Sequence, residues 1–226
     1  MPSFPPVLQS LPSGAYIFDK DGTLVDTEVV WVETYRRLLA PYGIVHDLDT
    51  HRRMMGTSAV DCIRLLQERH PSFAQGSDAV AALLEDRIRL FYATRDEMGV
   101  HPMAGAQDFL EMCVARKIPM AVATSASRVD AERELTQLGW HNWFGAIVTA
   151  DDVTRHKPAP DIFLEAARRL TMNPAACTAF EDGLNGVRSA HAAGMSVVFM
   201  RDSRFGITPP SEVALTVEGF GDLLAS

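Results

Sequence analysis

From Met103 onward, short apolar runs alternate with segments of helical periodicity. The predicted helices cover 107–116, 128–138, 160–170 and 185–193, and the apolar runs that follow them cover 118–123, 146–148, 177–180 and 196–200. Strands that are separated by a helix pair in parallel, and a parallel sheet needs helices on both faces. Together with an earlier apolar run, Ala15–Phe18, the alternation predicts a doubly wound α/β fold with a parallel sheet.

The stretch from 28 to 97 shows helical signals and no convincing strand. Its first helix is predicted to begin near Glu28 and to stop before Pro41, and Ser77 is a candidate N-cap of its last helix. We therefore expect an all-helical cap domain at 28–97, inserted into a core domain made of 1–27 and 98–226.

Composition limits the partners and the compartment. The chain has 226 residues, 47% of them hydrophobic, and a net charge of −8, which does not suit binding to nucleic acid or to an anionic membrane surface. Cys62, Cys113 and Cys177 are widely spaced among apolar neighbours, which favours reduced core thiols. The N-terminus shows no signal peptide pattern and no segment reaches transmembrane length, so we expect a soluble cytoplasmic protein.

Polar residues with related chemistry follow several of the predicted strands. In a parallel sheet the carboxyl ends of all strands lie at one edge, where ligands bind. The residues expected there are Asp19, Asp21, Thr124, Ser125, Lys157, Glu181 and Asp182. Carboxylates suit a hard cation, whereas hydroxyls and an ammonium suit an anion, so this set predicts a site for Mg²⁺ and phosphate.

Four motifs, in order along the chain, resemble those of the haloacid dehalogenase-like phosphohydrolase superfamily, in the branch with a helical cap after the first motif. The motifs are Asp19-Lys20-Asp21-Gly22-Thr23-Leu24-Val25-Asp26-Thr27-Glu28, Thr124-Ser125, Lys157-Pro158-Ala159-Pro160-Asp161 and Phe180-Glu181-Asp182-Gly183. The resemblance extends from Tyr16 to about Met200. It implies an Mg²⁺-dependent phosphatase that forms an aspartyl-phosphate, acts on a small phosphate ester and works as a monomer.

The resemblance also implies roles for the aspartates of the first motif. Asp19 is the expected nucleophile, because a carboxylate needs no deprotonation at neutral pH. Asp21 is the expected general acid and base. Taken alone, an Asp before Gly22 is also a common turn.

The other motifs are expected to bind the cation and the phosphoryl group. Asp182 would complete the metal shell with Asp19 and the backbone carbonyl of Asp21, and Glu181 would be a further ligand or lie just outside that shell. Without the other motifs, Glu181 and Asp182 are equally well explained as the polar start of a helix. The expected phosphate-binding residues are Thr124, Ser125, chiefly through its backbone N–H, and Lys157, and Ser127 is expected to cap the next helix.

The helical insertion is expected to select the substrate, because the core motifs handle only the phosphoryl group. Candidate residues there are Glu28, Trp31, His51, Arg52, Arg53, Gly56 and Thr57. Two structural explanations compete with this one: the arginines form a solvated basic face, and Trp31 is a core aromatic.

Three rival functions remain open at this stage. A sugar phosphomutase of the β-phosphoglucomutase type shares the four motifs, but it carries a histidine where this chain has Trp31 and an arginine where it has Ala59. A dehalogenase lacks an aspartate equivalent to Asp21. A catalytically silent binding module would have lost a charged motif residue, and this chain retains them all. The leading prediction is hydrolysis of a sugar phosphate, a polyol phosphate or a nucleoside monophosphate.

Overall fold

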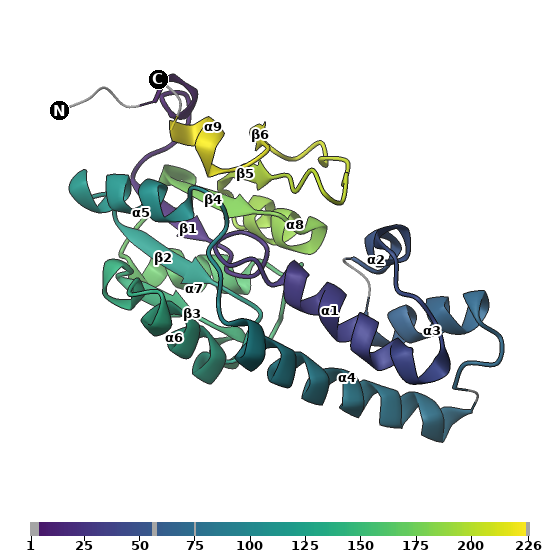
Figure 1. Ribbon diagram of the computed structural model, residues 1–226. Coiled ribbons are helices and arrows are strands. Elements are labelled where there is room, and N and C mark those ends of the chain that lie inside the picture. The colour runs from purple at the N-terminus through teal and green to yellow at the C-terminus, as the bar shows by residue number, and fades with distance from the viewer. Residues whose placement is uncertain (1–4, 56–57, 75, 225–226) are drawn as a thin grey trace. The chain divides into compact units, whose positions relative to one another are not determined.

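A computed structural model of the chain describes residues 5–55, 58–74 and 76–224 (Figure 1). The chain divides into two compact units, one made of Met1–Asp26 with His101–Ser226 and the other of Thr27–Val100. We call the first the α/β unit and the second the helical unit, and each is described by itself. That the two units are separate folding domains stays a prediction.

The α/β unit contains one six-stranded sheet in which every strand pairing is parallel. Its strands are β1 (Ala15–Phe18), β2 (Met120–Ala123), β3 (Ala146–Val148), β4 (Cys177–Glu181), β5 (Ser196–Met200) and β6 (Leu215–Val217). The order across the sheet is β3-β2-β1-β4-β5-β6. The strand order reverses at β1, and the carboxyl end of such a strand is the usual ligand position in open α/β sheets. The predicted fold class is confirmed.

Helices cover the two faces of this sheet with different side chains. The helices of the unit are α5 (Ala106–Ala115), α6 (Arg128–Gln137), α7 (Asp161–Arg169), α8 (Leu184–Ala192) and α9 (Phe220–Leu224). Tyr16 and Phe18 of β1 contact the rings of Phe109 in α5 and Phe220 in α9, so one face is aromatic.

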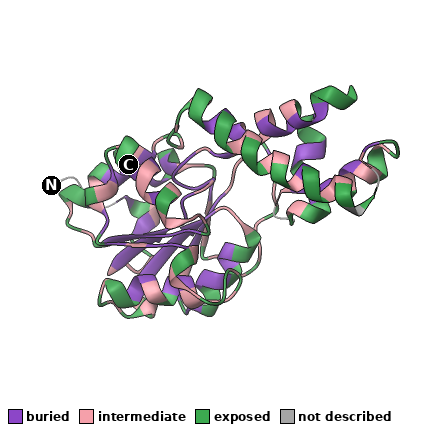
Figure 2. Cartoon of the chain, turned by 90° about the horizontal axis from the view of Figure 1, so that it is seen from below, coloured by how far each residue is buried: buried purple, intermediate pink, exposed green. Residues whose placement is uncertain are grey.

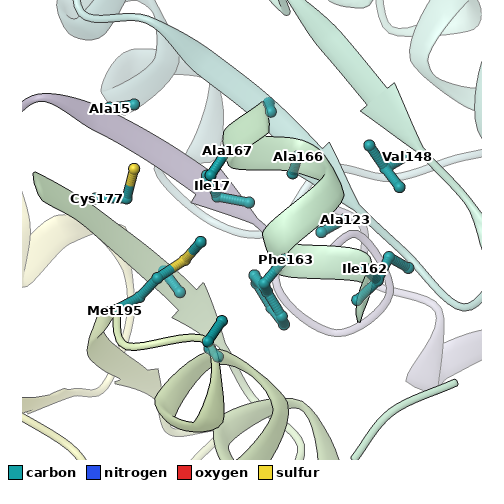
Figure 3. Close-up of a cluster of buried hydrophobic side chains, with 14 of the residues drawn as sticks. Ala15, Ile17, Ala123, Val148, Ile162, Phe163, Ala166, Ala167, Cys177 and Met195 are labelled. Carbon is teal, nitrogen blue, oxygen red and sulfur yellow. The ribbon is translucent and has the colours of Figure 1, made fainter. Parts of the chain in front are cut away.

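The opposite face is packed with smaller side chains. Because strand residues alternate between faces, Ala15 and Ile17 point away from the aromatic side and join a second buried cluster. Figure 3 shows Phe163, Ala166 and Ala167 of α7 against this part of the sheet. Both faces of β1 are thus buried, which explains why it appears in the sequence as a continuous apolar run.

The helical unit consists of α1 (Glu28–Leu39), α2 (Leu48–Met54), α3 (Ala59–Arg69) and α4 (Ser77–Met98). Its helices carry buried and exposed residues in alternation, whereas the strands of the sheet are almost wholly buried (Figure 2). A cluster that includes Leu39, Ile63, Leu66 and Phe73 forms its core. As predicted, no strand occurs among the described residues of 28–97.

Several short elements differ from prediction. Ser77 is the first residue of α4 and Gly76 occupies the N-cap position, so Ser77 as N-cap is wrong. Helix α2 was not expected because seven residues give little periodicity, although Asp47 caps it by accepting from Thr50 N at 2.7 Å. Strand β6 and helix α9 were missed for the same reason. Within residues 5–55, 58–74 and 76–224, the structure also has five short 3₁₀ helices: Pro6–Leu8, Ala40–Tyr42, His141–Trp143, Ala150–Asp152 and Pro174–Ala176.

Two further expectations concern the whole chain. The three cysteines are all buried, as predicted. Among the described residues, no helix combines the length and the apolar character needed to cross a lipid bilayer.

Candidate active site

The predicted strand-end residues lie at the carboxyl edge of the sheet. Asp19 directly follows β1, Thr124 directly follows β2, and Glu181 is the last residue of β4. Lys157 comes from the loop between β3 and α7 and reaches both Asp19 and Glu181. Four segments of the chain therefore meet beside the carboxyl end of β1.

Lys157 links two buried carboxylates. Its Nζ donates to Asp19 Oδ1 at 2.5 Å and to Glu181 Oε1 at 2.7 Å. Burial raises the pKa of the Asp19 carboxyl to about 7; Lys157 opposes this rise, while Glu181 and Asp21 add to it. Burial by itself would lower the pKa of Lys157, but the charges of Asp19 and Glu181 outweigh it and raise that pKa. Lys157 therefore remains a protonated ammonium that donates to Asp19.

Asp21 is held in a different way from Asp19. Lys20 Nζ donates to its Oδ1 at 2.7 Å, and Thr124 Oγ1 donates to its Oδ2 at 3.3 Å. Its side chain is 39% exposed, compared with 9% for that of Asp19. Asp21 is thus the more accessible of the two motif aspartates.

Asp182 packs against the turn that follows Asp21. Thr23 Oγ1 donates to Asp182 Oδ1 at 3.0 Å, and a Cβ added to Gly22 would lie only 2.2 Å from Asp182 Oδ2. Gly22 has φ +81°, so both the close approach and the backbone conformation require glycine. The carboxylate of Asp182 therefore lies directly against the backbone of the first motif.

Oxygen atoms of the first motif and of Asp182 suit a hard cation. Among the described residues, no three His, Cys, Asp or Glu side chains are grouped as a metal site. Two carboxylates, those of Asp19 and Asp182, and the backbone carbonyl of Asp21 are nevertheless donors of the kind that Mg²⁺ takes, with water in the remaining positions. The residues present therefore fit a site that shares its ligands between side chains, backbone and solvent.

Glu181 is occupied on both oxygens. Besides Lys157 on Oε1, it accepts from Gly183 N on Oε2 at 2.7 Å. A Cβ added to Gly186 would lie 1.5 Å from Glu181 Oε1, so helix α8 passes against this carboxylate. These contacts suit a group that orients Lys157 and the turn into α8.

The residues after β2 form the predicted strand-to-helix turn. Thr124 is buried, and its hydroxyl accepts from Ala126 N at 3.0 Å while it donates to Asp21. Ser125 is exposed, next to Thr124. Ser127 caps α6 by accepting from Asp130 N, as predicted.

The predicted residues of the helical unit divide into two groups. A pocket of about 190 Å³ within this unit is lined by Glu28 and Trp31, together with His51, Tyr35, Met55 and Arg87 among others. Arg52 and Arg53 are exposed on α2 and do not line it, and Arg53 pairs with Asp49 at 3.1 Å. Gly56 and Thr57 lie outside the described residues.

Polar groups in this pocket are held by buried partners. His51 Nε2 lies 2.8 Å from Glu28 Oε2, and His51 Nδ1 lies 3.0 Å from His46 Nε2. Burial lowers the pKa of His46 to about 4, and His51 adds to this effect, so His46 is neutral at pH 7. A neutral His46 can donate through Nε2 to His51, which leaves His51 Nε2 to donate to the Glu28 carboxylate. The hydrogen bonds from His46 to His51 and from His51 to Glu28 fix the orientation of the Glu28 carboxylate.

Two side chains of α4 lie against the ring of Trp31. Arg87 Cζ lies 3.9 Å from its ring centroid, and the ring of Phe91 stacks at 4.0 Å. Arg87 Nε also donates to Tyr35 Oη at 2.7 Å. Trp31 therefore lines the pocket and is also, in part, the core aromatic considered above, because it packs against the core cluster of this unit.

Sequence reasoning missed three polar residues near these sites: Lys20, Glu134 and Arg87. Lys20 stands inside the first motif, but its partner Glu134 is 114 positions away in α6. Arg87 lies in the middle of the long helix α4, where a charged residue is usually solvated. A buried or stacked charge leaves no mark in the sequence, so only the structure identifies these residues.

The amino-acid sequence of this chain is similar to a known family and to characterised proteins. Residues 16–200 match the family model described as haloacid dehalogenase-like hydrolase. Fructose-1-phosphate phosphatase YqaB of Escherichia coli is 35% identical over 192 residues, which cover 82% of this chain and 95% of that protein. A phosphorylated carbohydrates phosphatase of Thermotoga maritima is 32% identical over 185 residues, with 82% and 83% covered.

The fold is matched as well. The crystal structure of a putative β-phosphoglucomutase from Thermotoga maritima aligns with a TM-score of 0.74 at 28% identity, covering 93% of this chain and 96% of that one. The matched residues 16–200 contain all four motifs that surround Asp19. This chain therefore belongs to the haloacid dehalogenase-like hydrolase family and is a phosphatase of that family.

Proposed function

We propose that this phosphatase hydrolyses phosphate monoesters of small sugars or polyols through an aspartyl-phosphate on Asp19. The observation that carries the proposal is the buried bond between Asp19 and Lys157, with Asp21, Thr124 and Asp182 gathered around the same strand end. A buried carboxylate that is held by a fixed ammonium is oriented for attack, and its neighbours supply the acid, the donors and the cation ligands.

In the first step, an oxygen of Asp19 forms a bond to phosphorus while the bond from phosphorus to the ester oxygen breaks. The electron pair of that bond leaves with the ester oxygen, which takes a proton from the carboxyl group of Asp21. Asp21 suits this role because its side chain is 39% exposed and can meet a leaving group.

In the second step, Asp21 is a carboxylate and takes a proton from water. The water oxygen forms a bond to phosphorus, the bond from phosphorus to Asp19 breaks, and its electron pair returns to Asp19. Inorganic phosphate leaves and Asp21 holds a proton again, so both aspartates end as they began.

Charge is the main obstacle to the first step. Two unit charges about 4 Å apart repel by roughly 4 kcal/mol at an effective dielectric constant near 20, and a phosphate dianion adds to this. Lys157 offsets part of the repulsion, and Glu181 orients Lys157. Mg²⁺ would be held by Asp19, Asp182 and the backbone carbonyl of Asp21, and when bound it supplies positive charge beside the phosphoryl group.

The phosphoryl oxygens need donors on the side away from the cation. We assign these to the Ser125 backbone N–H, the Lys157 ammonium and the Thr124 hydroxyl, whose single proton turns from Asp21 to the phosphoryl group when substrate is bound. Thr124 and Ser125 precede α6, so their backbone lies close to the start of a helix, where N–H groups favour anions.

The substrate class rests on the relatives and on the pocket of the helical unit. YqaB is named as a fructose-1-phosphate phosphatase, and the Thermotoga maritima relative as a phosphatase of phosphorylated carbohydrates. We assign the pocket bearing Glu28, His51 and Arg87 to the organic part of the ester. The Glu28 carboxylate and the Arg87 guanidinium are suitable hydrogen-bond partners for the hydroxyls of a sugar or polyol, and His51 orients Glu28.

A phosphomutase is the second candidate, because a structural relative is described as a putative β-phosphoglucomutase. Its branch carries a histidine at the position of Trp31. An indole ring cannot exchange a proton with a substrate hydroxyl, and here it lies against Arg87 and Phe91. This observation favours phosphate release over transfer to a second hydroxyl.

The test is a phosphate-release assay on a panel of sugar phosphates, polyol phosphates and nucleoside monophosphates. We expect turnover of sugar or polyol esters that requires Mg²⁺, stops with EDTA and is absent in Asp19→Asn. The exposed Asp108→Asn in α5 is the matched control and should retain activity. No turnover by the wild type would favour a silent binding module, whereas full turnover by Asp19→Asn would overturn the role of Asp19 as nucleophile. With β-glucose 1-phosphate and a trace of the bisphosphate, isomer exchange faster than phosphate release would favour the mutase.

A further inference from the structure

Lys20 is a buried charge that the mechanism above does not use. It stands between the two motif aspartates, yet its side chain is only 1% exposed. Its Nζ donates to Asp21 Oδ1 at 2.7 Å and also to Glu134 Oε2 in α6, whose side chain is 3% exposed. The lysine thus joins the candidate acid and base to a glutamate 114 positions away.

Stability alone gives a weak reason for this pair. Burying an ammonium and a carboxylate costs solvation free energy, and well-packed apolar residues of similar size are often as stable or more so. Burial would by itself lower the pKa of Lys20, but the charges of Asp21 and Glu134 outweigh it and raise that pKa. The Lys20 ammonium is therefore bound between the carboxylates of Asp21 and Glu134.

The contacts of Asp21 indicate the role of the Lys20 ammonium. A side chain that is 39% exposed is not fixed by packing, so its orientation depends on its hydrogen bonds. Lys20 engages Oδ1 from the buried side, and Thr124 engages Oδ2. A carboxylate bound at both oxygens has one favoured rotamer.

Both of these contacts are anchored at α6. Thr124 lies in the turn that leads into this helix, which Ser127 caps, and Glu134 lies within it. Glu134 fixes the far side of the Lys20 ammonium, so the lysine cannot follow Asp21 if the carboxylate rotates. Helix α6 therefore holds Asp21 through Lys20 as well as through Thr124.

We propose that Lys20 and Glu134 are positioning residues that hold the Asp21 carboxyl group in the orientation needed for proton transfer to the leaving oxygen. The inference rests on the proposed function, in which Asp21 is the general acid. Lys20 and Glu134 themselves do not contact the substrate; they act through Asp21.

Two classes of substrate separate positioning from general structural support. A sugar or polyol alkoxide needs a proton as it leaves, whereas p-nitrophenolate leaves without one at neutral pH. The value of kcat/KM reports the steps up to the first bond cleavage. We therefore measure kcat/KM with Mg²⁺ for a sugar phosphate and for p-nitrophenyl phosphate, in the wild type and in each variant.

The variants are Lys20→Met, Lys20→Arg and Glu134→Gln, with Glu132→Gln as the matched control on α6, where Glu132 pairs with Arg128 at 3.1 Å in a partly exposed position. For Lys20→Met we expect a loss of about 10- to 100-fold on the sugar phosphate and less than about 3-fold on the nitrophenyl ester, as befits displacement of a general acid. Lys20→Arg should recover part of the loss, Glu134→Gln should show a smaller loss with the same selectivity, and Glu132→Gln should match the wild type.

A second comparison uses the Asp21→Asn background. If Lys20 acts through Asp21, adding Lys20→Met to Asp21→Asn lowers kcat/KM for the sugar phosphate by less than about 2-fold further, because the effects of residues that act as one unit are not additive.

Equal losses on both substrates, no loss, or a full additional loss in the double variant would overturn the inference. Should Lys20→Met fail to fold, Glu134→Gln and Lys20→Arg carry the same test. A wild type that releases no phosphate from either ester overturns the proposed function as well, whereas the other outcomes leave it intact.

Discussion

The two aspartates of the first motif each bind one lysine, and each lysine also binds one glutamate from elsewhere in the chain. We call Asp19, Lys157 and Glu181 the Lys157 cluster, and Asp21, Lys20 and Glu134 the Lys20 cluster. The side chains of the lysines and glutamates of both clusters are at most 8% exposed, but the aspartates differ: the side chain of Asp19 is 9% exposed and that of Asp21 is 39% exposed.

This difference matches two chemical tasks. A nucleophile benefits from burial, because it must be fixed in one orientation and shielded from competing water. An acid and base has to meet the leaving group in one step and water in the next, so it needs an open side. The same lysine and glutamate arrangement can therefore hold two carboxylates that differ in exposure, and variants can show whether the two clusters are equivalent.

The largest effect is expected from Asp21→Asn. Loss of the acid and base should lower kcat/KM for a sugar phosphate by about 10³-fold, within the usual range for such a group. The loss on p-nitrophenyl phosphate should be much smaller, because that leaving group needs no proton. Steady-state assays with both esters provide the measurement, and equal losses on the two esters would remove the proposed distinction between Asp21 and Asp19.

An intermediate effect is expected on stability when each lysine is replaced by methionine. Lys157→Met leaves both Asp19 and Glu181 buried without their cation, and breaking a buried pair in this way costs about 3 kcal/mol or more. Lys20→Met leaves only Glu134 buried, because Asp21 keeps contact with water, so its cost should be smaller. Urea unfolding followed by circular dichroism at pH 8 without divalent cations measures both. A larger loss for Lys20→Met would show that exposure of the aspartate does not set the cost.

The smallest effect is the pH dependence contributed by Asp19. Its pKa is raised from 3.8 to about 7 in the folded protein, so between these values the folded state holds a proton that the unfolded state has released. Stability of the wild type therefore falls as the pH rises from about 4 to 7, and Asp19→Asn removes this loss. Without divalent cations, the gain in stability of Asp19→Asn over the wild type should be larger at pH 8 than at pH 5.

We expect this increase to be at least about 1 kcal/mol, or roughly 2–4 °C in Tm for a chain of this size. Thermal melts of both proteins at the two pH values provide the measurement, and comparison with the wild type at each pH cancels the other titrating groups. A gain that is equal at pH 5 and pH 8 would mean that Lys157 keeps Asp19 ionised throughout. The nucleophile would then already be charged before any cation binds.

Most regular elements could be predicted because local patterns specify them. The strand Ala15–Phe18 was expected with the bounds that the structure has, and the helix expected from near Glu28 to before Pro41 is observed at Glu28–Leu39. Short elements such as α2 and β6 could not be, since seven or three residues carry too little periodicity to stand out. The N-cap of α4 was misplaced by one residue, because Gly76 rather than Ser77 occupies it.

The sequence by itself determined the parallel α/β fold and the residues at its strand ends, because apolar periodicity and strand-end positions are local properties of the chain. Only the tertiary structure decided which of those residues bind one another. Lys20 and Glu134 meet through a strand-end loop and a helix that are far apart in the sequence, and the pocket of the helical unit joins α1, α2 and α4. Such pairings depend on how several elements pack in three dimensions, and no periodicity in the sequence records that packing.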